Sequence, residues 1–157
     1  MSKPEVEIFC DGSCPVPQKE GGWAFILRLK STGTEKCGSG GEKVTTNNRM
    51  ELTALIEALK ALPVSCNVTI TGDSQYVLFG LQKWLPGWKK KGWKRFDQET
   101  RKLVEVANVG LWKEMDALLA KHEYKINWVR GHNGHPENEL CDKMAGEETK
   151  KMKNSSI

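Results

Sequence analysis

The segment Val6-Glu7-Ile8-Phe9-Cys10-Asp11-Gly12-Ser13 alternates like a strand and then ends in a turn signal. It predicts a strand over residues 6–10 and a turn over 11–13. Gly22–Leu29 is almost wholly apolar, as a strand buried on both faces should be, and Glu35–Val44 has a weaker strand pattern. Because the connections between these segments are short, we expect an antiparallel meander.

The rest of the chain alternates helical and strand patterns. An apolar stripe from Leu52 to Leu62 stops at Pro63 and predicts a helix after residues 45–48. The later expectations, in order, are a strand over 68–71, a helix over 74–84 broken by Pro86-Gly87, a helical region over 103–119, a strand over 124–129, and a helix from about 137 that frays into a polar tail over 150–157. This order predicts a mixed α/β sheet with helices on its faces.

Length and composition restrict the class of protein. The 157 residues suit one domain, here taken as residues 1–157, and 38% hydrophobic with 28% charged residues suits a soluble globular chain. No apolar run reaches the roughly 18 residues of a membrane helix, and residues 1–5 carry no signal-peptide pattern. We therefore expect a cytoplasmic protein that does not enter membranes. Five scattered cysteines without a CxxC pair argue against a disulfide framework or a structural zinc site.

Positive charge is concentrated in one segment, although the net charge is only +4. Between Lys83 and Arg95 there are six basic residues and no acidic one, and Trp84, Trp88 and Trp93 are interleaved among them. Basic side chains pair with phosphates, and indoles offer surfaces for stacking on sugars or bases. The alternative is a solvated face whose tryptophans anchor it to the core. The clustering favours a nucleic-acid surface.

Two acidic residues follow predicted strands. Asp11 and Asp73 each stand at a strand's carboxyl end, the edge at which open α/β sheets bind their ligands. Each has a structural alternative, since Asp11 suits a turn and Asp73 suits the N-cap of the next helix.

Two further acids belong to predicted helices. Glu51 points along the buried side of its helix, where an unpartnered charge is costly, although a capping box with Asn48 would also explain it. Asp142 opens the last helix, where the helix dipole alone would favour an acid.

Acids at strand ends and helix starts can converge on one rim, and convergent carboxylates repel unless cations bridge them. Hard oxygen ligands suit Mg²⁺ or Mn²⁺, and two such ions support phosphodiester hydrolysis. His132, in a glycine-rich loop, could shuttle protons at neutral pH, whereas His135 before Pro136 suits loop packing. Soft ligands for zinc are too few.

Several segments together resemble a type 1 ribonuclease H of the bacterial ribonuclease HI branch. They occur in family order and cover residues 5 to 145. They are Ile8–Ser13, Thr45–Leu52, Asp73–Val77, Trp88–Lys94, Asn108 ahead of Leu111-Trp112, and Trp128–Glu139 running on to Cys141-Asp142.

The resemblance implies a five-stranded mixed sheet, three antiparallel strands followed by two parallel ones, flanked by helices. It also implies an endonuclease that hydrolyses the RNA strand of RNA–DNA hybrids by a two-metal-ion mechanism and leaves 5′-phosphate and 3′-hydroxyl ends. The cofactor would be Mg²⁺, two ions per site, with Mn²⁺ as a substitute. We expect a monomer without an obligate protein partner.

The resemblance also implies roles for individual residues. The catalytic, metal-binding carboxylates would be Asp11, Glu51, Asp73 and Asp142, with His132 assisting acid–base chemistry or product release. Substrate-binding residues would be Asn47, Asn48 and Gln75 in the groove, and Trp84, Lys89, Lys90, Lys91, Trp93 and Lys94 in a protruding handle that grips the DNA strand.

Some segments depart from the family pattern. Pro15–Glu20 replaces a glycine-rich loop that carries a substrate-contacting Asn, Val44 stands where relatives often have Arg, and the segment over 95–110 is longer than usual. None of these touches the carboxylates, so we expect activity with altered substrate affinity. Because the first strand begins near residue 5, we expect no N-terminal hybrid-binding module. The alternatives are a non-catalytic nucleic-acid-binding module and a different nuclease on the same sheet.

Overall fold

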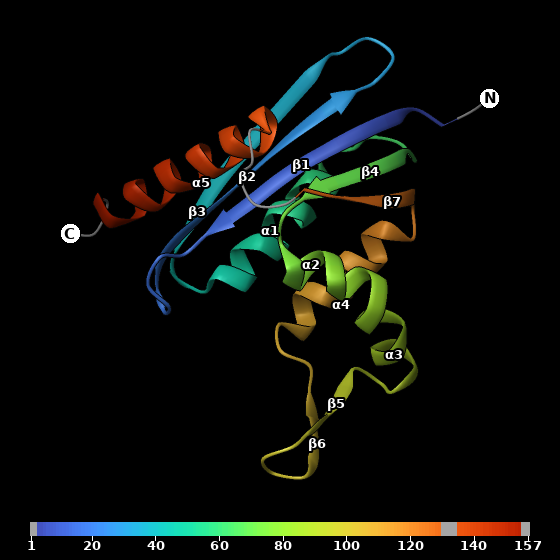
Figure 1. The fold of residues 1–157 in the computed structure, drawn as a ribbon, viewed down its shortest axis with the longest axis vertical. Helices are drawn as coiled ribbons and strands as arrows, with labels where there is room; N and C mark the ends of the chain where they lie inside the picture. Colours follow the sequence, from blue (N-terminus) through green and yellow to red (C-terminus); the bar gives the residue numbers. More distant parts are fainter. Residues whose placement is uncertain (1–2, 130–134, 155–157) are drawn as a thin grey trace.

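The computed structural model describes residues 3–129 and 135–154. Its main sheet has five strands in the order β3-β2-β1-β4-β7 (Figure 1). The strands are β1 (Glu5–Ser13), β2 (Lys19–Leu29), β3 (Glu35–Thr45), β4 (Asn67–Gly72) and β7 (Glu123–Trp128). Strands β1, β2 and β3 pair antiparallel, whereas β4 lies parallel to both β1 and β7. The expected mixed sheet is therefore confirmed.

Helices cover both faces of this sheet, as Figure 1 shows. Helices α1 (Asn47–Lys60) and α4 (Val109–Leu119) pack on one face around the fully buried Trp112. Helix α5 (Pro136–Asn154) lies on the other face, where Cys141 and Ala145 pack against β1 and β2. Strand β2 accordingly buries apolar side chains on both sides, as its sequence predicted. No helix in the described ranges is long and apolar enough to span a bilayer.

After β4 and a two-residue connection, the chain forms one unbroken helical segment. It consists of α2 (Gln75–Phe79), the π-helical turn η1 (Gly80–Trp84) and α3 (Leu85–Lys90). The expectation that Pro86-Gly87 ends the helix is wrong. Pro86 lies in the first turn of α3, directly after the π-helical turn η1, and the helical path continues across it. The helix therefore continues to the basic segment.

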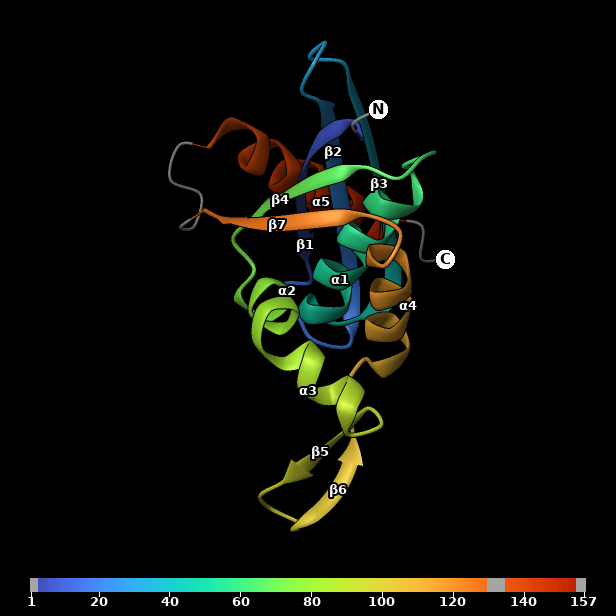
Figure 2. The ribbon, with the colours of Figure 1, turned by 90° about the vertical axis from the view of Figure 1, so that its right-hand side faces the viewer.

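A two-stranded ribbon of β5 (Lys94–Asp97) and β6 (Lys102–Glu105) projects from the helical side of the molecule (Figure 2). This ribbon corrects the expected helix over 103–119, since residues 103–105 are extended and α4 begins only at Val109. Phe96 pairs with Leu103 across the ribbon, and both side chains are exposed. The two strands are short, and most of their residues are polar or charged, so the sequence shows no clear strand pattern here.

Three other boundaries differ from the expectations. Strand β1 runs through the expected turn to Ser13 because β2 pairs with it to the end. Helix α1 ends at Lys60, before Pro63 is reached. Helix α5 continues to Asn154, so residues 150–154 are helical where a polar tail was expected. All five cysteines are free, as expected.

Candidate active site

Asp11 lies at the centre of the candidate site. Its side chain is only 8% exposed, near the end of β1, and its Oδ1 accepts a hydrogen bond from the Gly12 N–H at 2.9 Å. Burial, the charge of Asp73, a hydrogen bond with Asp142, and the charges of Asp142 and Glu51 together raise the pKa of Asp11 to about 8. The structure thus brings the four predicted carboxylates into one neighbourhood. The turn interpretation of Asp11 is wrong, since it pairs with Ala24 inside the sheet.

Glu51 reaches this neighbourhood from the first turns of α1. Its Oε2 accepts a hydrogen bond from Ser74 Oγ at 2.5 Å, and its Oε1 accepts one from Asn47 Nδ2 at 3.2 Å. Burial raises the pKa of Glu51, these two hydrogen bonds oppose the rise, and the charge of Asp73 adds to it. The capping-box alternative is wrong because the N-cap is Thr46, whose hydroxyl accepts the Arg49 N–H.

Asp73 and Asp142 approach from two further elements. Asp73 is half-buried and follows β4, whose carboxyl end lies at the same sheet edge as that of β1 because the strands are parallel. It is not a helix cap, since Ser74 caps α2 by accepting the Val77 N–H. Asp142 is exposed and lies in the second turn of α5. The helix dipole acts mainly on the first turn and does not account for it.

A glycine allows β1 and α1 to meet at this edge. A Cβ atom on Gly12 would overlap the backbone of Met50 and Glu51. The missing side chain therefore lets the α1 backbone approach β1 directly after Asp11, so that Glu51 can share its surroundings.

The donor set suits a hard divalent cation. Four carboxyl groups could supply oxygen ligands, and the pKa of Asp11, raised by burial and by the neighbouring negative charges, indicates a site where a bound cation would be stabilising. Within the described residues, however, no three Asp, Glu, His or Cys side chains already form a cluster that encloses an ion. A cation would have to draw the carboxylates closer together.

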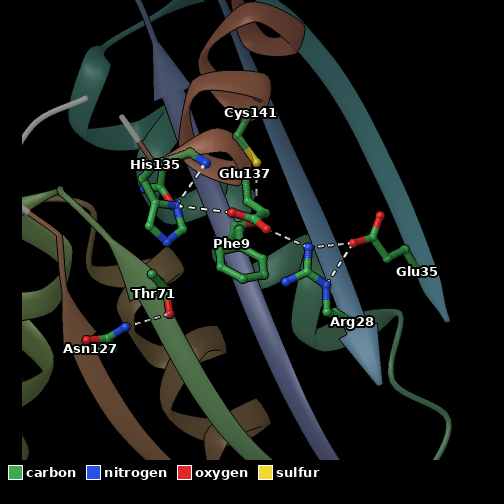
Figure 3. Close-up of polar contacts among 9 residues, drawn as sticks. Phe9, Arg28, Glu35, Thr71, Asn127, His135, Glu137 and Cys141 are labelled. Atoms are coloured by element: carbon green, nitrogen blue, oxygen red, sulfur yellow. Dashed lines mark hydrogen bonds and ion pairs between the residues drawn. The ribbon is translucent and has the colours of Figure 1, made fainter. Parts of the chain in front are cut away.

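An ion-pair network attaches the start of α5 to the sheet (Figure 3). Arg28 Nη2 lies 2.6 Å from Glu137 Oε1 and 2.6 Å from Glu35 Oε2, and its guanidinium lies 5.1 Å from the centre of the Phe9 ring. His135 packs against Phe9, with ring centres 5.5 Å apart, and its Nδ1 lies 3.4 Å from Glu137. His135 therefore packs as expected. No sequence pattern pointed to Arg28, which is paired with a residue on a distant element.

The predicted groove residues flank the carboxylates. Asn47, Asn48 and Gln75 are exposed at the starts of α1 and α2, and Asn47 donates to Glu51. His132 lies outside the described residues, so the structure does not place it.

The tryptophans and the lysines of the basic segment differ in their burial. Trp84 is 40% exposed, whereas Trp88 and Trp93 are half-buried and pack against the main core. The lysines of this segment are exposed, namely Lys89, Lys90, Lys91 and Lys94. The tryptophans thus anchor the segment, and Trp84 and the lysines form its accessible surface.

Comparisons with known proteins agree with this fold. The RNase H family model matches residues 3–150. The ribonuclease H of Citrobacter koseri is 51% identical over 141 residues, which are 90% of this chain and 86% of that protein. The crystal structure of LC9-RNase H1, a type 1 RNase H with the type 2 active-site motif, superposes with a TM-score of 0.83 at 28% identity, over 97% of this chain and 75% of that one. LC11-RNase H1 in complex with an RNA/DNA hybrid shares the fold, with a TM-score of 0.68 at 18% identity, over 93% of this chain and 97% of that one. The resemblance drawn from the motifs is confirmed, and the chain belongs to the ribonuclease H family.

Proposed function

We propose that this chain is a metal-dependent endoribonuclease that hydrolyses the RNA strand of RNA–DNA hybrids and leaves 5′-phosphate and 3′-hydroxyl ends. The observation that carries the proposal is the gathering of Asp73, Asp142 and Glu51 around Asp11, whose pKa is raised to about 8 by its burial and by these three neighbours. Four acids from four elements are a costly arrangement in a folded protein unless they bind a cation. Membership of the ribonuclease H family supports the same reaction.

The four carboxylates would hold the metal. Two Mg²⁺ ions, or Mn²⁺ in their place, would supply an activated water and stabilise the leaving oxygen when bound. Asp11 is the most buried of the four acids, so it would provide the fixed ligand around which the others arrange. Ser74 and Asn47 hold the Glu51 carboxylate through hydrogen bonds and so restrict its orientation. His132, which precedes α5 in the sequence, would move a proton during the reaction.

Substrate recognition would divide between two surfaces. Asn47, Asn48 and Gln75 are polar and exposed beside the carboxylates, where contacts to a 2′-hydroxyl would separate RNA from DNA. The exposed lysines of the basic segment and Trp84 would hold the DNA strand through phosphate and stacking contacts. We propose that the chain acts as a monomer.

Cleavage assays on matched duplexes test this function. RNA–DNA, RNA–RNA and DNA–DNA duplexes of one sequence are incubated with Mg²⁺, Mn²⁺ or a chelator. We expect cleavage of the RNA in the hybrid alone, and none with the chelator. Cleavage of the DNA duplex would instead identify a different nuclease on this fold, and salt-sensitive binding without product would identify a binding module.

Asp73→Asn tests the role of the carboxylates, with Glu147→Gln as the control, because Glu147 is an exposed acid of α5 away from the described interactions. We expect Asp73→Asn to lose cleavage but to retain hybrid binding, and Glu147→Gln to behave like the parent chain. Retained cleavage in Asp73→Asn would exclude the two-metal assignment.

A further inference from the structure

Arg28 makes three contacts that meet at the start of helix α5 (Figure 3). It lies near the end of β2, and its side chain is 27% exposed. Its Nη2–H donates to Glu137 Oε1 at 2.6 Å, and its Nε–H donates to Glu35 Oε2 at 2.8 Å. One planar group thus joins β2 to the beginning of β3 and to the first turn of α5.

The third contact of the guanidinium is with β1. It lies 5.1 Å from the centre of the Phe9 ring, which is only 2% exposed, and a cation over an aromatic face is attracted to the ring. His135, directly before α5, packs against the same ring, with ring centres 5.5 Å apart. Strand β1 is therefore in contact both with the guanidinium and with the residue that precedes α5.

The residues that Arg28 contacts are close in sequence to two of the carboxylates. Phe9 and Asp11 are two residues apart on β1, so their side chains project from the same face of the sheet. Glu137 and Asp142 are five residues apart on α5, a rise of about 7.5 Å along the helix. Arg28 therefore joins the part of β1 that carries Asp11 to the turn of α5 that precedes Asp142.

The position of Asp142 depends on how α5 is attached to the sheet. Its side chain is exposed, whereas Asp11 is buried in the sheet and hydrogen bonds hold Glu51. Core packing from Cys141 onward fixes the middle of α5, and the ion pair of Arg28 fixes its first turn. Both attachments are needed to define the direction of the helix axis, and this direction decides whether Asp142 reaches its hydrogen bond with Asp11.

We infer that Arg28 is a positioning residue for Asp142. Its contacts with Glu137 and Phe9 set the direction of α5 relative to β1, and this direction sets the separation of Asp142 from Asp11. Arginine suits the role because one planar group with several N–H donors meets two carboxylates and a ring at once, which the single ammonium of lysine does not. The inference rests on the proposed function, since it assumes that Asp142 is a metal ligand.

Calorimetry with Mn²⁺ alone tests the inference without any cleavage. Arg28→Met removes the guanidinium, and Glu137→Gln removes the charge of its partner. Losing a group that orients a metal ligand commonly weakens metal binding by about 10- to 100-fold, so we expect each variant to bind Mn²⁺ about tenfold more weakly than the parent chain. The double variant should bind no more weakly than either single variant, because both remove the same contact. Additive losses would overturn the inference.

Lys60→Met is the matched control. Lys60 also bridges two carboxylates, with its Nζ 3.2 Å from Glu57 Oε2 and 3.0 Å from Glu114 Oε2. It lies at the last residue of α1, however, at the opposite end of that helix from Glu51. We expect Lys60→Met to bind Mn²⁺ like the parent chain, although it also loses an ion pair. Parent-like binding by Arg28→Met, or equal weakening in Arg28→Met and Lys60→Met, would overturn the inference.

Asp142→Asn separates positioning from general destabilisation. If Arg28 acts through Asp142, Arg28→Met should change the Mn²⁺ affinity by less than about twofold in a chain that already carries Asp142→Asn. The free energy of unfolding should still fall in that chain, because the ion pair with Glu137 is lost in either case. A weakening of about tenfold that persists alongside Asp142→Asn would overturn the inference.

The two proposals fail in different ways. If the parent chain binds Mn²⁺ and cuts the hybrid, but Arg28→Met binds Mn²⁺ equally well, only the positioning role is wrong. If Arg28→Met weakens Mn²⁺ binding through Asp142 but the parent chain cuts no hybrid, the proposed hydrolysis is wrong, whereas the positioning role stands. A parent chain that binds no Mn²⁺ would overturn both.

Discussion

Replacing Asp11 by asparagine should stabilise the protein in the absence of metal. The pKa of Asp11 is about 8 in the folded chain, against an ordinary value of 3.8. Below pH 4 the carboxyl is protonated in both states and contributes nothing to the pH dependence. Between pH 4 and pH 8 the unfolded chain releases a proton that the folded chain retains, so stability falls as pH rises. Asp11→Asn removes this loss.

The size of the gain follows from the same values. At about 1.4 kcal/mol per pH unit, the difference between 3.8 and about 8 sets a ceiling of roughly 6 kcal/mol, reached above pH 8. The true gain is smaller than this ceiling, because the neighbouring carboxylates titrate together with Asp11 and can move away from it. We therefore expect Asp11→Asn to raise the free energy of unfolding by about 1–3 kcal/mol at pH 8 and by less at pH 5. Saturating Mg²⁺ should reduce the difference in stability between Asp11→Asn and the parent chain, because Mg²⁺ binds the parent site more tightly than the variant site.

Urea unfolding followed by circular dichroism measures these differences, at pH 5 and pH 8, with chelator or Mg²⁺. Glu147→Gln is the control, since it removes an exposed charge from the same protein. The reasoning is refuted if Asp11→Asn is less stable than the parent chain in chelator. It is also refuted if the advantage of the variant is the same at both pH values.

Three further substitutions test other parts of the structure. Arg28→Met removes the guanidinium that joins Glu137 to the sheet, and it should lower the free energy of unfolding in urea by about 1–2 kcal/mol. An unchanged unfolding midpoint would mean that the ion pair does not contribute to stability. Gly12→Ala should lower the free energy of unfolding by about 2 kcal/mol or more, because the added methyl group would push Glu51 away from β1. The same displacement should weaken Mg²⁺ binding measured by calorimetry, and an unaltered metal affinity would contradict this. His132→Ala should slow turnover by a factor of ~10²–10³ with metal affinity unchanged, and a loss of metal binding would instead make the histidine a ligand.

The sequence was sufficient to predict most of the sheet and the gathering of the acids. Asp11 and Asp73 follow strand patterns, and parallel pairing of β1 and β4 brings their ends to one edge. The position of Glu51 on an amphipathic helix correctly predicted that its side chain lies on the buried side. In the structure, hydrogen bonds from Ser74 and Asn47 hold the Glu51 carboxylate, and no capping box with Asn48 forms.

Other features depend on interactions that local patterns do not report. Arg28 contacts Glu137 across 109 positions of sequence, and a single basic residue at the end of a strand carries no sign of that pairing. The β5–β6 ribbon escaped prediction because its strands are short, charged and exposed. The helix across Pro86 was not predicted from the sequence, because a proline occurs both after the end of a helix and in the first turn of one. The sequence alone does not distinguish these two cases.

Helix α5 contributes its acid late in the order of synthesis. Asp11, Glu51 and Asp73 all leave the ribosome before Asp142, and Asp142 reaches them only when α5 packs across β1 and β2. A nascent polypeptide therefore holds an incomplete set of these carboxylates until α5 has been synthesised and has packed on the sheet. Under the proposed function, hydrolysis of the RNA in a hybrid would begin only after this last packing step.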